Sequence, residues 1–193
     1  MTHPATVVWS YKNRAQTLIK SVRTAAFGLP LQTPVLLIDG GTTNLQLNTV
    51  KQELHGTPLD IRYIDTFSGT SLVEAWNLGL RYSNTEQVIF CSSDVVFKRG
   101  NWFDRLTSAC TAQNPYVLLQ NHAVFALHRN LVKRVGWFDE GFTNGPHFDV
   151  DYMVRASEAG FRVRVLKSHG SYTHSTPQLE ATRAGNPDRM PRS

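Results

Sequence analysis

The apolar segment at residues 90–97, FCSSDVVF, is interrupted by Ser92, Ser93 and Asp94. A carboxylate at the end of a strand can hold a hard cation such as Mg²⁺ or Mn²⁺, because these ions take few protein ligands and complete their shell with substrate phosphates. Serine hydroxyls are weaker metal ligands but good hydrogen-bond donors. Ser and Asp are also ordinary turn residues, so the triplet taken alone is more typical of a plain turn.

A second pair of carboxylates, Asp149 and Asp151, stands at the start of a helix predicted over residues 149–159. Negative charge is favourable at a helix N-terminus, which would give both residues a purely structural role. Residues two apart on a helix point to different faces, so at most one of them can face a site. Asp151 can pair with Arg155 one turn later, which leaves Asp149 as the candidate general base.

Other candidate ligands follow other predicted strands. Asp39 comes directly after PVLLI, where its carboxylate can accept hydrogen bonds from a ribose or a base edge, or can form a turn. His169 and His174 lie in KSHGSYTHS, after the last predicted strand. A lone histidine is usually structural, but one that shares a site with a metal carboxylate is a ligand candidate, and imidazole favours Mn²⁺ over Mg²⁺.

Alternating strands and helices must position these side chains. Short strands are predicted at residues 5–9, 34–38, 59–64, 87–91, 116–119, 123–127 and 162–166. In the helices between them, Asn13 is a predicted cap, Gly28 a predicted end, and Ser71 and Glu74 have capping-box spacing. Because the early strands are apolar throughout, we expect an α/β fold with a mainly parallel central sheet covered on both faces, and a small antiparallel addition in the second half.

Ligands of such sheets bind beyond the carboxyl ends of the strands. Polar residues stand at three of those ends, namely Ser10–Arg14, Asp39-Gly40-Gly41 and Ser92-Ser93-Asp94. These ends meet at one edge of a parallel sheet, so the sequence predicts a single site there.

Length and composition set the outer limits. The 193 residues suit one domain, which we place at residues 1–175, and residues 176–193 lack an apolar period and are expected to form a flexible tail. The net charge of +5 favours anionic partners, but it is spread too evenly to indicate a nucleic-acid surface. Cys91 and Cys110 are expected to be buried free thiols. The chain shows no signal peptide and no apolar run near the ~20 residues of a membrane span, so a cytoplasmic protein is expected.

The order of these motifs resembles the GT-A glycosyltransferases, specifically the large family 2, over roughly residues 5–175. The similar stretches are VVWSYKNR with Tyr11, Asn13 and Arg14, PVLLIDGGTTN with Asp39, AWNLGLRYS with Asn77 and Gly79, FCSSDVVF with Asp94, VGWFDEGF at residues 135–142, the segment from Asp149 to Arg155, and His169 followed by Gly-Ser. Each motif is short, and it is their order and spacing together that make the resemblance specific.

The resemblance implies a single Rossmann-like GT-A domain that moves a sugar from a nucleotide-diphosphate sugar, with a UDP-sugar favoured, to an acceptor hydroxyl. It implies an inverting displacement assisted by Mn²⁺ or Mg²⁺, with Asp149 as the base and Asp94 and His169 as metal ligands. The donor-binding candidates are Ser10, Tyr11, Asn13, Arg14, Asp39, Asn77, Ser92, Ser93 and Asp94. The candidates on the acceptor side are Trp137, Asp151 and His174.

Two departures from the family pattern keep alternatives open. Ser92 replaces the first Asp of the metal motif, and Phe148 replaces the Glu before the base. A degenerate, non-catalytic binding module therefore stays an alternative to the transferase. A nucleotidyltransferase is disfavoured because SYKNRAQT lacks a glycine-rich phosphate loop. The acceptor is left open among a saccharide, a lipid-linked sugar, a protein and a modified nucleic-acid base.

Overall fold

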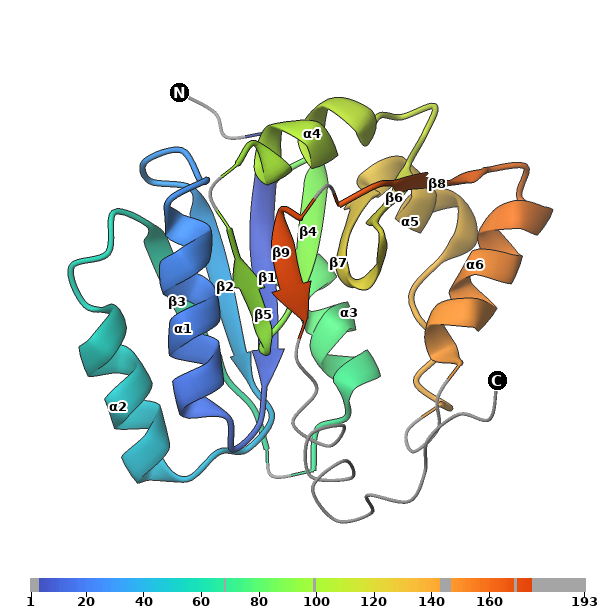
Figure 1. The fold of residues 1–193 in the computed structure, drawn as a ribbon. Helices are drawn as coiled ribbons and strands as arrows, with labels where there is room; N and C mark the ends of the chain where they lie inside the picture. Colours follow the sequence, from blue (N-terminus) through green and yellow to red (C-terminus); the bar gives the residue numbers. More distant parts are fainter. Residues whose placement is uncertain (1–3, 68, 99, 143–146, 169, 175–193) are drawn as a thin grey trace, which may run out of the picture.

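A seven-stranded sheet forms the centre of the molecule, with helices on both faces (Figure 1). The computed structural model describes residues 4–174 apart from residues 68, 99, 143–146 and 169. The strands of the sheet lie in the order β3-β2-β1-β4-β7-β6-β8. They are β1 (Ala5–Tyr11), β2 (Pro34–Asp39), β3 (Asp60–Asp65), β4 (Gln87–Ser92), β6 (Tyr116–Leu119), β7 (Asn121–His128) and β8 (Val163–Leu166). β7 runs antiparallel to both of its neighbours, and the other pairings in this sheet are parallel, which confirms the predicted fold class.

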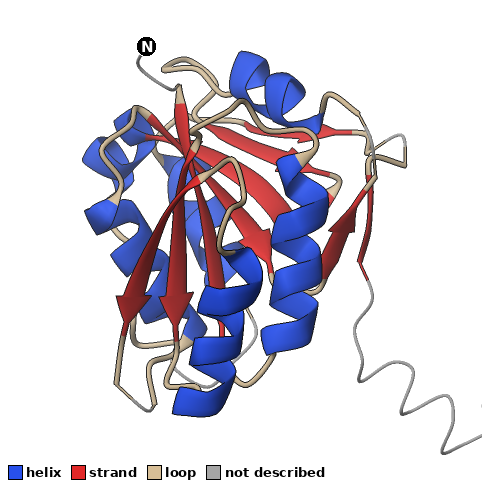
Figure 2. Ribbon diagram, turned by 90° about the vertical axis from the view of Figure 1, so that its left-hand side faces the viewer, coloured by secondary structure: helices blue, strands red, loops and turns tan. Residues whose placement is uncertain are grey.

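Helices form a layer on each face of the sheet (Figure 2). One layer holds α1 (Ala15–Ala26), α2 (Asn44–Leu54) and α4 (Trp102–Ala109), and the other holds α3 (Leu72–Tyr82), α5 (Arg129–Val135) and α6 (Phe148–Glu158). Side chains of a strand alternate between the two faces, so Val7 and Trp9 of β1 pack into one core cluster and Val8 into the other. Each buried strand therefore needs apolar residues in succession, as the sequence of β1 shows.

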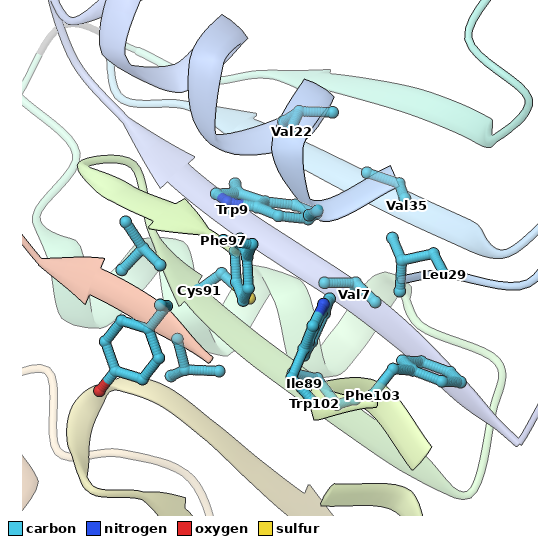
Figure 3. Close-up of a cluster of buried hydrophobic side chains, with 14 of the residues drawn as sticks. Val7, Trp9, Val22, Leu29, Val35, Ile89, Cys91, Phe97, Trp102 and Phe103 are labelled. Carbon is cyan, nitrogen blue, oxygen red and sulfur yellow. The ribbon is translucent and has the colours of Figure 1, made fainter. Parts of the chain in front are cut away.

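The core under α1 fixes the position of the loop that follows β1. Leu18, Ile19 and Val22 recur at helical spacing and are buried against the sheet, where each contributes about 1.5–3 kcal/mol of hydrophobic stabilisation. Trp9 lies in the same cluster as Val22 in Figure 3, and its indole N–H donates a 2.9 Å hydrogen bond to Ser21 Oγ. Strand and helix are thereby held together, and the short loop between them is held at the carboxyl edge of the sheet.

On the opposite face, α3 crosses very close to the sheet. Its N-terminus carries the predicted capping box, in which Ser71 Oγ accepts from the Glu74 N–H and the Glu74 carboxylate accepts from the Ser71 N–H. A Cβ atom at Gly79 would lie 2.7 Å from Val8 Cγ1, so only glycine allows this approach. The first turn of α3 consequently lies at the carboxyl ends of β1 and β4.

A small second sheet pairs β5 (Val95–Phe97) with β9 (Tyr172–His174) in antiparallel register. β9 is anchored by Tyr172, whose hydroxyl donates to the Leu119 carbonyl at 2.7 Å and also contacts Asn121 Oδ1 at 2.9 Å. The late segment of the chain is therefore brought back over the end of β4, as Figure 1 shows.

Several local predictions were wrong, and others lie outside the described residues. Asn13 does not cap α1, because the N-cap residue is Arg14, and Asn13 instead adopts a left-handed conformation with φ of 52°. Gly28 directly follows the C-cap of α1, as predicted, and it also allows close packing, since a Cβ there would lie 2.6 Å from Trp102 Nε1. The elements α2, β5 and β9 were not predicted. The predicted tail at residues 176–193 lies outside the described part of the chain.

Candidate functional site

A cleft of about 840 Å³ opens at the carboxyl ends of β1 and β4. Its walls come from the loop after β1, the first turns of α3 and α6, the end of β4, the start of β7, and β9. The cleft therefore lies at the sheet edge where the sequence predicted a single site. Of the donor-site candidates it includes Ser10, Tyr11, Asn13, Arg14, Ser92 and Ser93 in its lining.

Asp94 is the most heavily contacted carboxylate of the cleft region. Its Oδ1 atom accepts from Ser92 Oγ at 2.7 Å and lies 3.0 Å from His174 Nε2, and its Oδ2 atom lies 3.4 Å from Arg14 Nη1. The side chain of Asp94 is only 3% exposed. We call Arg14, Ser92, Asp94 and His174 the Asp94 side of the cleft.

The strand register explains why His174 reaches Asp94. His174 pairs with Val95, the residue that follows Asp94, so the two side chains meet at the end of the β5–β9 sheet. This places His174 at the predicted metal carboxylate, whereas the sequence had assigned it to the acceptor side. The histidine predicted for that role, His169, lies outside the described residues.

The pKa values on this side favour an ion pair. Burial alone would raise the pKa of Asp94, but hydrogen bonds from His174 and Ser92, together with the charge of His174, outweigh burial and lower it. The hydrogen bond to Asp94 raises the pKa of His174, against the opposing effects of burial and Arg14. Both shifts favour the charged forms, an Asp94 carboxylate that faces His174 and the Arg14 guanidinium.

The second carboxylate, Asp149, lies in the first turn of α6 and also lines the cleft. Its Oδ2 atom is 3.1 Å from His122 Nδ1, and its Oδ1 atom accepts from the Val150 N–H at 2.9 Å. The other ring nitrogen of that histidine, His122 Nε2, is 2.8 Å from the hydroxyl of the buried Tyr116. We call Tyr116, His122 and Asp149 the Asp149 side of the cleft.

The protonation state differs on this side. Burial lowers the pKa of His122, and the neighbouring Asp149 offsets that effect only in part. Burial also raises the pKa of Tyr116, so its hydroxyl keeps its proton. The histidine between Tyr116 and Asp149 is therefore neutral at physiological pH.

An aromatic wall joins the two sides. Trp76 contacts Phe148 and Phe125 edge-on, with ring centroids 4.9 and 4.8 Å apart. These three side chains and Phe90 line the cleft. Phe148, which replaces the Glu of the family motif, thus makes this part of the wall apolar.

Tyr11 contributes a polar atom that has no partner within the described structure. Its hydroxyl is buried without a hydrogen bond among the described residues. Burial raises the pKa of Tyr11, and the charge of Asp39 adds to the effect, so the phenol stays neutral. Tyr11 lines the cleft, but its hydroxyl itself is buried.

Asp94 contacts the lining residues Arg14, Ser92 and His174 without lining the cleft itself, and four further described candidates do not line it. Asp39 is buried and accepts from the Thr42 N–H at 2.9 Å within its own loop. Asn77 bonds to Phe138 and Glu140 and so holds the 138–140 loop against α3. Asp151 pairs with Arg155 at 2.8 Å, as predicted, and Trp137 is 44% exposed beneath the Arg81 guanidinium. In this structure these four side chains make contacts around the cleft and form no part of its lining.

Sequence reasoning missed His122 and Tyr116. The available signal was the polar turn Gln120-Asn121-His122 between two predicted strands. β7 is antiparallel to both β4 and β6, so β6 runs in the same direction as β4, as does its parallel neighbour β8. The turn at the carboxyl end of β6 therefore stands on the same edge of the sheet as the rest of the site. Reading that turn as a fourth polar strand end would have included His122.

The Asp94 side also offers a donor set for a divalent cation. Ser92 Oγ lies 2.7 Å from Asp94 Oδ1, and His174 Nε2 lies 3.0 Å from the same oxygen, so three candidate ligand atoms lie close together. Within residues 4–174 as described, no group of three or more His, Cys, Asp or Glu side chains gathers to hold a metal. This set is thus open, and it fits a cation that takes its remaining ligands from a phosphate substrate and water.

Cys91 and Cys110 are buried free thiols, as predicted, and Cys91 forms part of the cleft lining. None of the helices in the described part of the chain has the length and apolar character to cross a membrane.

Comparison with known proteins places these features in a family context. The model of the family described as glycosyl transferase family 2 matches residues 6–168. A search of curated proteins finds no match. The crystal structure of S. aureus TarS 1-349 is similar with a TM-score of 0.73 at 14% identity, covering 94% of this chain and 64% of that chain. The crystal structure of the same TarS fragment in complex with UDP-GlcNAc gives a TM-score of 0.70 at 13% identity, and the match covers 93% of this chain and 61% of that chain.

A third similar structure is the mannosyltransferase PcManGT from Pyrobaculum calidifontis in complex with GDP-Man and Mn²⁺. Its TM-score is 0.64 at 16% identity, and the match covers 85% of this chain and 55% of that chain. At such identities the likeness establishes the fold. The chain spans less than two thirds of the length of these structures.

Proposed function

The chain belongs to glycosyl transferase family 2, and on that premise we propose that it transfers a sugar from a nucleoside diphosphate sugar to an acceptor hydroxyl. The observation that carries this proposal is the cleft with two Asp–His pairs of opposite character, one ionic and one neutral. A transferase of this kind needs both a cationic end for the leaving diphosphate and a base for the acceptor.

The Asp94 side is the proposed donor end. Arg14 extends from the start of α1 with its guanidinium 3.4 Å from Asp94, and a guanidinium donates well to phosphate oxygens. Ser10 and Ser93 line the same part of the cleft and add donors. Tyr11, which lines the cleft, is the proposed contact for the nucleoside.

Asp94, Ser92 and, once it has released its proton, His174 would hold a divalent cation at this end. The imidazole favours Mn²⁺ over Mg²⁺, and the single carboxylate leaves ligand positions for the diphosphate. When bound, the cation supplies Lewis-acid neutralisation of the leaving diphosphate. His174 takes the role that the sequence had given to His169.

Asp149 is the proposed general base. Its carboxylate would accept the proton of the acceptor hydroxyl while the acceptor oxygen forms a bond to the anomeric carbon. The bond from that carbon to the diphosphate oxygen breaks at the same time, and its electron pair leaves with the nucleoside diphosphate. A single displacement of this type inverts the anomeric configuration.

The donor is proposed to be a UDP-sugar. UDP-GlcNAc is the ligand in one similar structure and GDP-Man in another, so both nucleotides belong in the first test. The aromatic wall around Trp76 and Phe148 offers an apolar face for the acceptor, which is compatible with a saccharide ring stacked by its C–H face. A lipid-linked sugar, a protein or a modified nucleic-acid base remain acceptors to be screened.

Calorimetric titration of the protein with UDP, GDP, dTDP and CDP, each with and without Mn²⁺, tests the donor site. Binding of one nucleotide that depends on Mn²⁺ and is lost in Asp94→Ala supports the proposal and selects the donor class. If the folded protein binds none of the four, the non-catalytic module suggested by Ser92 and Phe148 replaces it.

A further inference from the structure

A chain of three side chains runs from the core to the cleft on the Asp149 side. Tyr116 on β6 is fully buried, His122 stands at the start of β7 with 19% of its side chain exposed, and Asp149 in α6 faces the cleft. The distances are 2.8 Å from Tyr116 Oη to His122 Nε2 and 3.1 Å from His122 Nδ1 to Asp149 Oδ2. The function proposed above assigns no step of the reaction to Tyr116 or His122.

The protons in this chain can be assigned from its chemistry. Tyr116 keeps its phenolic proton, and among the described residues its hydroxyl contacts His122 alone. The carboxylate of Asp149 can only accept, so the ring nitrogen facing it must carry the hydrogen. A neutral His122 has one N–H, which is then Nδ1–H, and Nε2 accepts from Tyr116. Donor and acceptor alternate along the chain, and each contact is satisfied in one tautomer.

The same geometry excludes His122 as the base itself. Its accepting nitrogen, Nε2, points to a fully buried tyrosine, so an acceptor hydroxyl in the cleft does not reach it. Its cleft-side nitrogen, Nδ1, carries the hydrogen and donates. Asp149 keeps the free lone pairs of its carboxylate for the acceptor proton.

We propose that His122, locked in its Nδ1–H tautomer by Tyr116, is a positioning residue that orients the Asp149 carboxylate for proton abstraction from the acceptor hydroxyl. The proposal rests on the transferase function proposed above. No proton leaves His122 in the step, since the acceptor proton moves to Asp149 while the Nδ1–H bond continues to hold Oδ2. A neutral partner also suits a base, because a positively charged histidine at the same place would reduce the tendency of the carboxylate to take up a proton.

The two ring nitrogens allow a matched pair of substitutions. The amide nitrogen of Asn overlays Nδ1 of histidine, so His122→Asn keeps the donor to Asp149 and loses the contact with Tyr116. The amide group of Gln reaches the Nε2 position, so His122→Gln keeps the contact with Tyr116 and loses the donor to Asp149. A role in packing alone would not separate these two variants.

The kinetic test compares both variants with wild type and with His128→Asn. His128 lies at the far end of β7, where its Nδ1 accepts from the Asn130 N–H, a contact that Asn can reproduce. We expect His122→Gln to lower kcat by roughly tenfold or more with the donor KM unchanged, and His122→Asn to restore most of that loss. His122→Gln with the kcat of wild type, or a loss of equal size in both variants, would overturn the proposal.

A second test does not depend on turnover. Nitrogen-15 NMR of the histidine rings in the metal-free protein at pH 7.5 reports which nitrogen of His122 is protonated, with His122→Gln used to assign the signal. We expect the Nδ1–H tautomer in wild type and a loss of that preference in Tyr116→Phe. An Nε2–H tautomer in wild type would overturn the inference. If wild type transfers no sugar to any acceptor, the proposed function fails, and the NMR result still decides how His122 is held.

Discussion

Asp94 and Asp149 each meet a histidine at the cleft, but the two histidines carry different charge. His174 is 31% exposed, and its hydrogen bond to Asp94 is the strongest influence on its pKa, which rises. His122 is 19% exposed, and burial is the strongest influence on its pKa, which falls. The same pair of residue types is thus ionic on the Asp94 side and neutral on the Asp149 side.

This difference follows from what surrounds each pair. Asp94 is almost fully buried and receives bonds from Ser92, His174 and Arg14, so its charge is compensated inside the protein. Asp149 is 28% exposed, and the buried phenol of Tyr116 satisfies the far nitrogen of His122 without adding a charge. The first arrangement suits an anionic ligand and the second suits a carboxylate that must take up a proton.

The largest expected effect comes from removing the base. Asp149→Asn keeps the size of the side chain but cannot accept a proton, so we expect kcat to fall by about 10³-fold. Donor affinity should not change, because the Asp94 side is untouched. The measurement is product formation by mass spectrometry, together with nucleotide titration of the same sample.

Asp151→Asn is the matched control for this substitution. Asp151 lies on the same helical turn, pairs with Arg155 and does not line the cleft, so turnover should stay near that of wild type. Equal turnover in Asp149→Asn and wild type would show that the base lies elsewhere and would end the contrast between the two sides.

The next effect is on the Asp94 side. Asp94→Ala removes the carboxylate shared by Ser92, His174 and Arg14, and we expect nucleotide affinity in the presence of Mn²⁺ to fall by roughly 100-fold. Affinity is measured by calorimetry on samples whose thermal unfolding confirms the fold. Asp104→Ala, on the exposed side of α4, is the control. If Asp94→Ala leaves the Mn²⁺-dependent affinity for nucleotide unchanged, the donor site does not use this carboxylate.

The contrast also shows how far the fold follows from the sequence. The runs ATVVW, PVLLI and QVIFC have no polar interruption, and a strand buried on both faces requires this, so the parallel sheet was predictable. β5 and β9 have three residues each, and their pairing is stabilised by Tyr172 contacting the β6–β7 turn. No local pattern reports that contact, and both strands were missed.

The site was predictable where side chains stand at the carboxyl ends of parallel strands, because these ends share one edge of the sheet. Arg14, Ser92 and Asp94 follow the neighbouring strands β1 and β4, and direct contacts join their side chains. His174 and His122 depend on β9 returning to Val95 and on β7 reversing direction, which are long-range pairings. The contact between His174 and Asp94 could therefore not be predicted from spacing alone.

A smaller effect tests the departure from the family motif. Ser92→Asp restores a second carboxylate next to Asp94, so we expect Mn²⁺ affinity to rise by about tenfold, because ligand charge governs affinity for hard cations. Without metal the two carboxylates repel each other, and the melting temperature of the metal-free variant should fall. The measurement is Mn²⁺ titration followed by electron paramagnetic resonance, with Ser93→Asp as the control for added charge. Equal Mn²⁺ affinity in Ser92→Asp and wild type would place the cation away from Ser92.

The smallest effect separates the two histidines by the pH dependence of stability, measured on metal-free protein by urea unfolding between pH 8 and pH 5.5. The pKa of His122 is lowered in the folded state. His122 therefore destabilises the folded protein as the pH falls below 6.5, the pKa of histidine in the unfolded chain. The pKa of His174 is raised, so its stabilising contribution is fully present below pH 6.5 and is lost as pH rises through the folded value.

His122→Asn and His174→Gln remove these two contributions while each keeps a neutral donor to its carboxylate. On acidification, the free energy of unfolding of His122→Asn should therefore rise relative to wild type, and that of His174→Gln should fall relative to wild type. His128, whose pKa is also lowered by burial, is present in all three proteins and cancels in the differences. Differences of the same sign in both variants would show that the two pairs share one protonation state, because only an ionic pair and a neutral pair give opposite slopes.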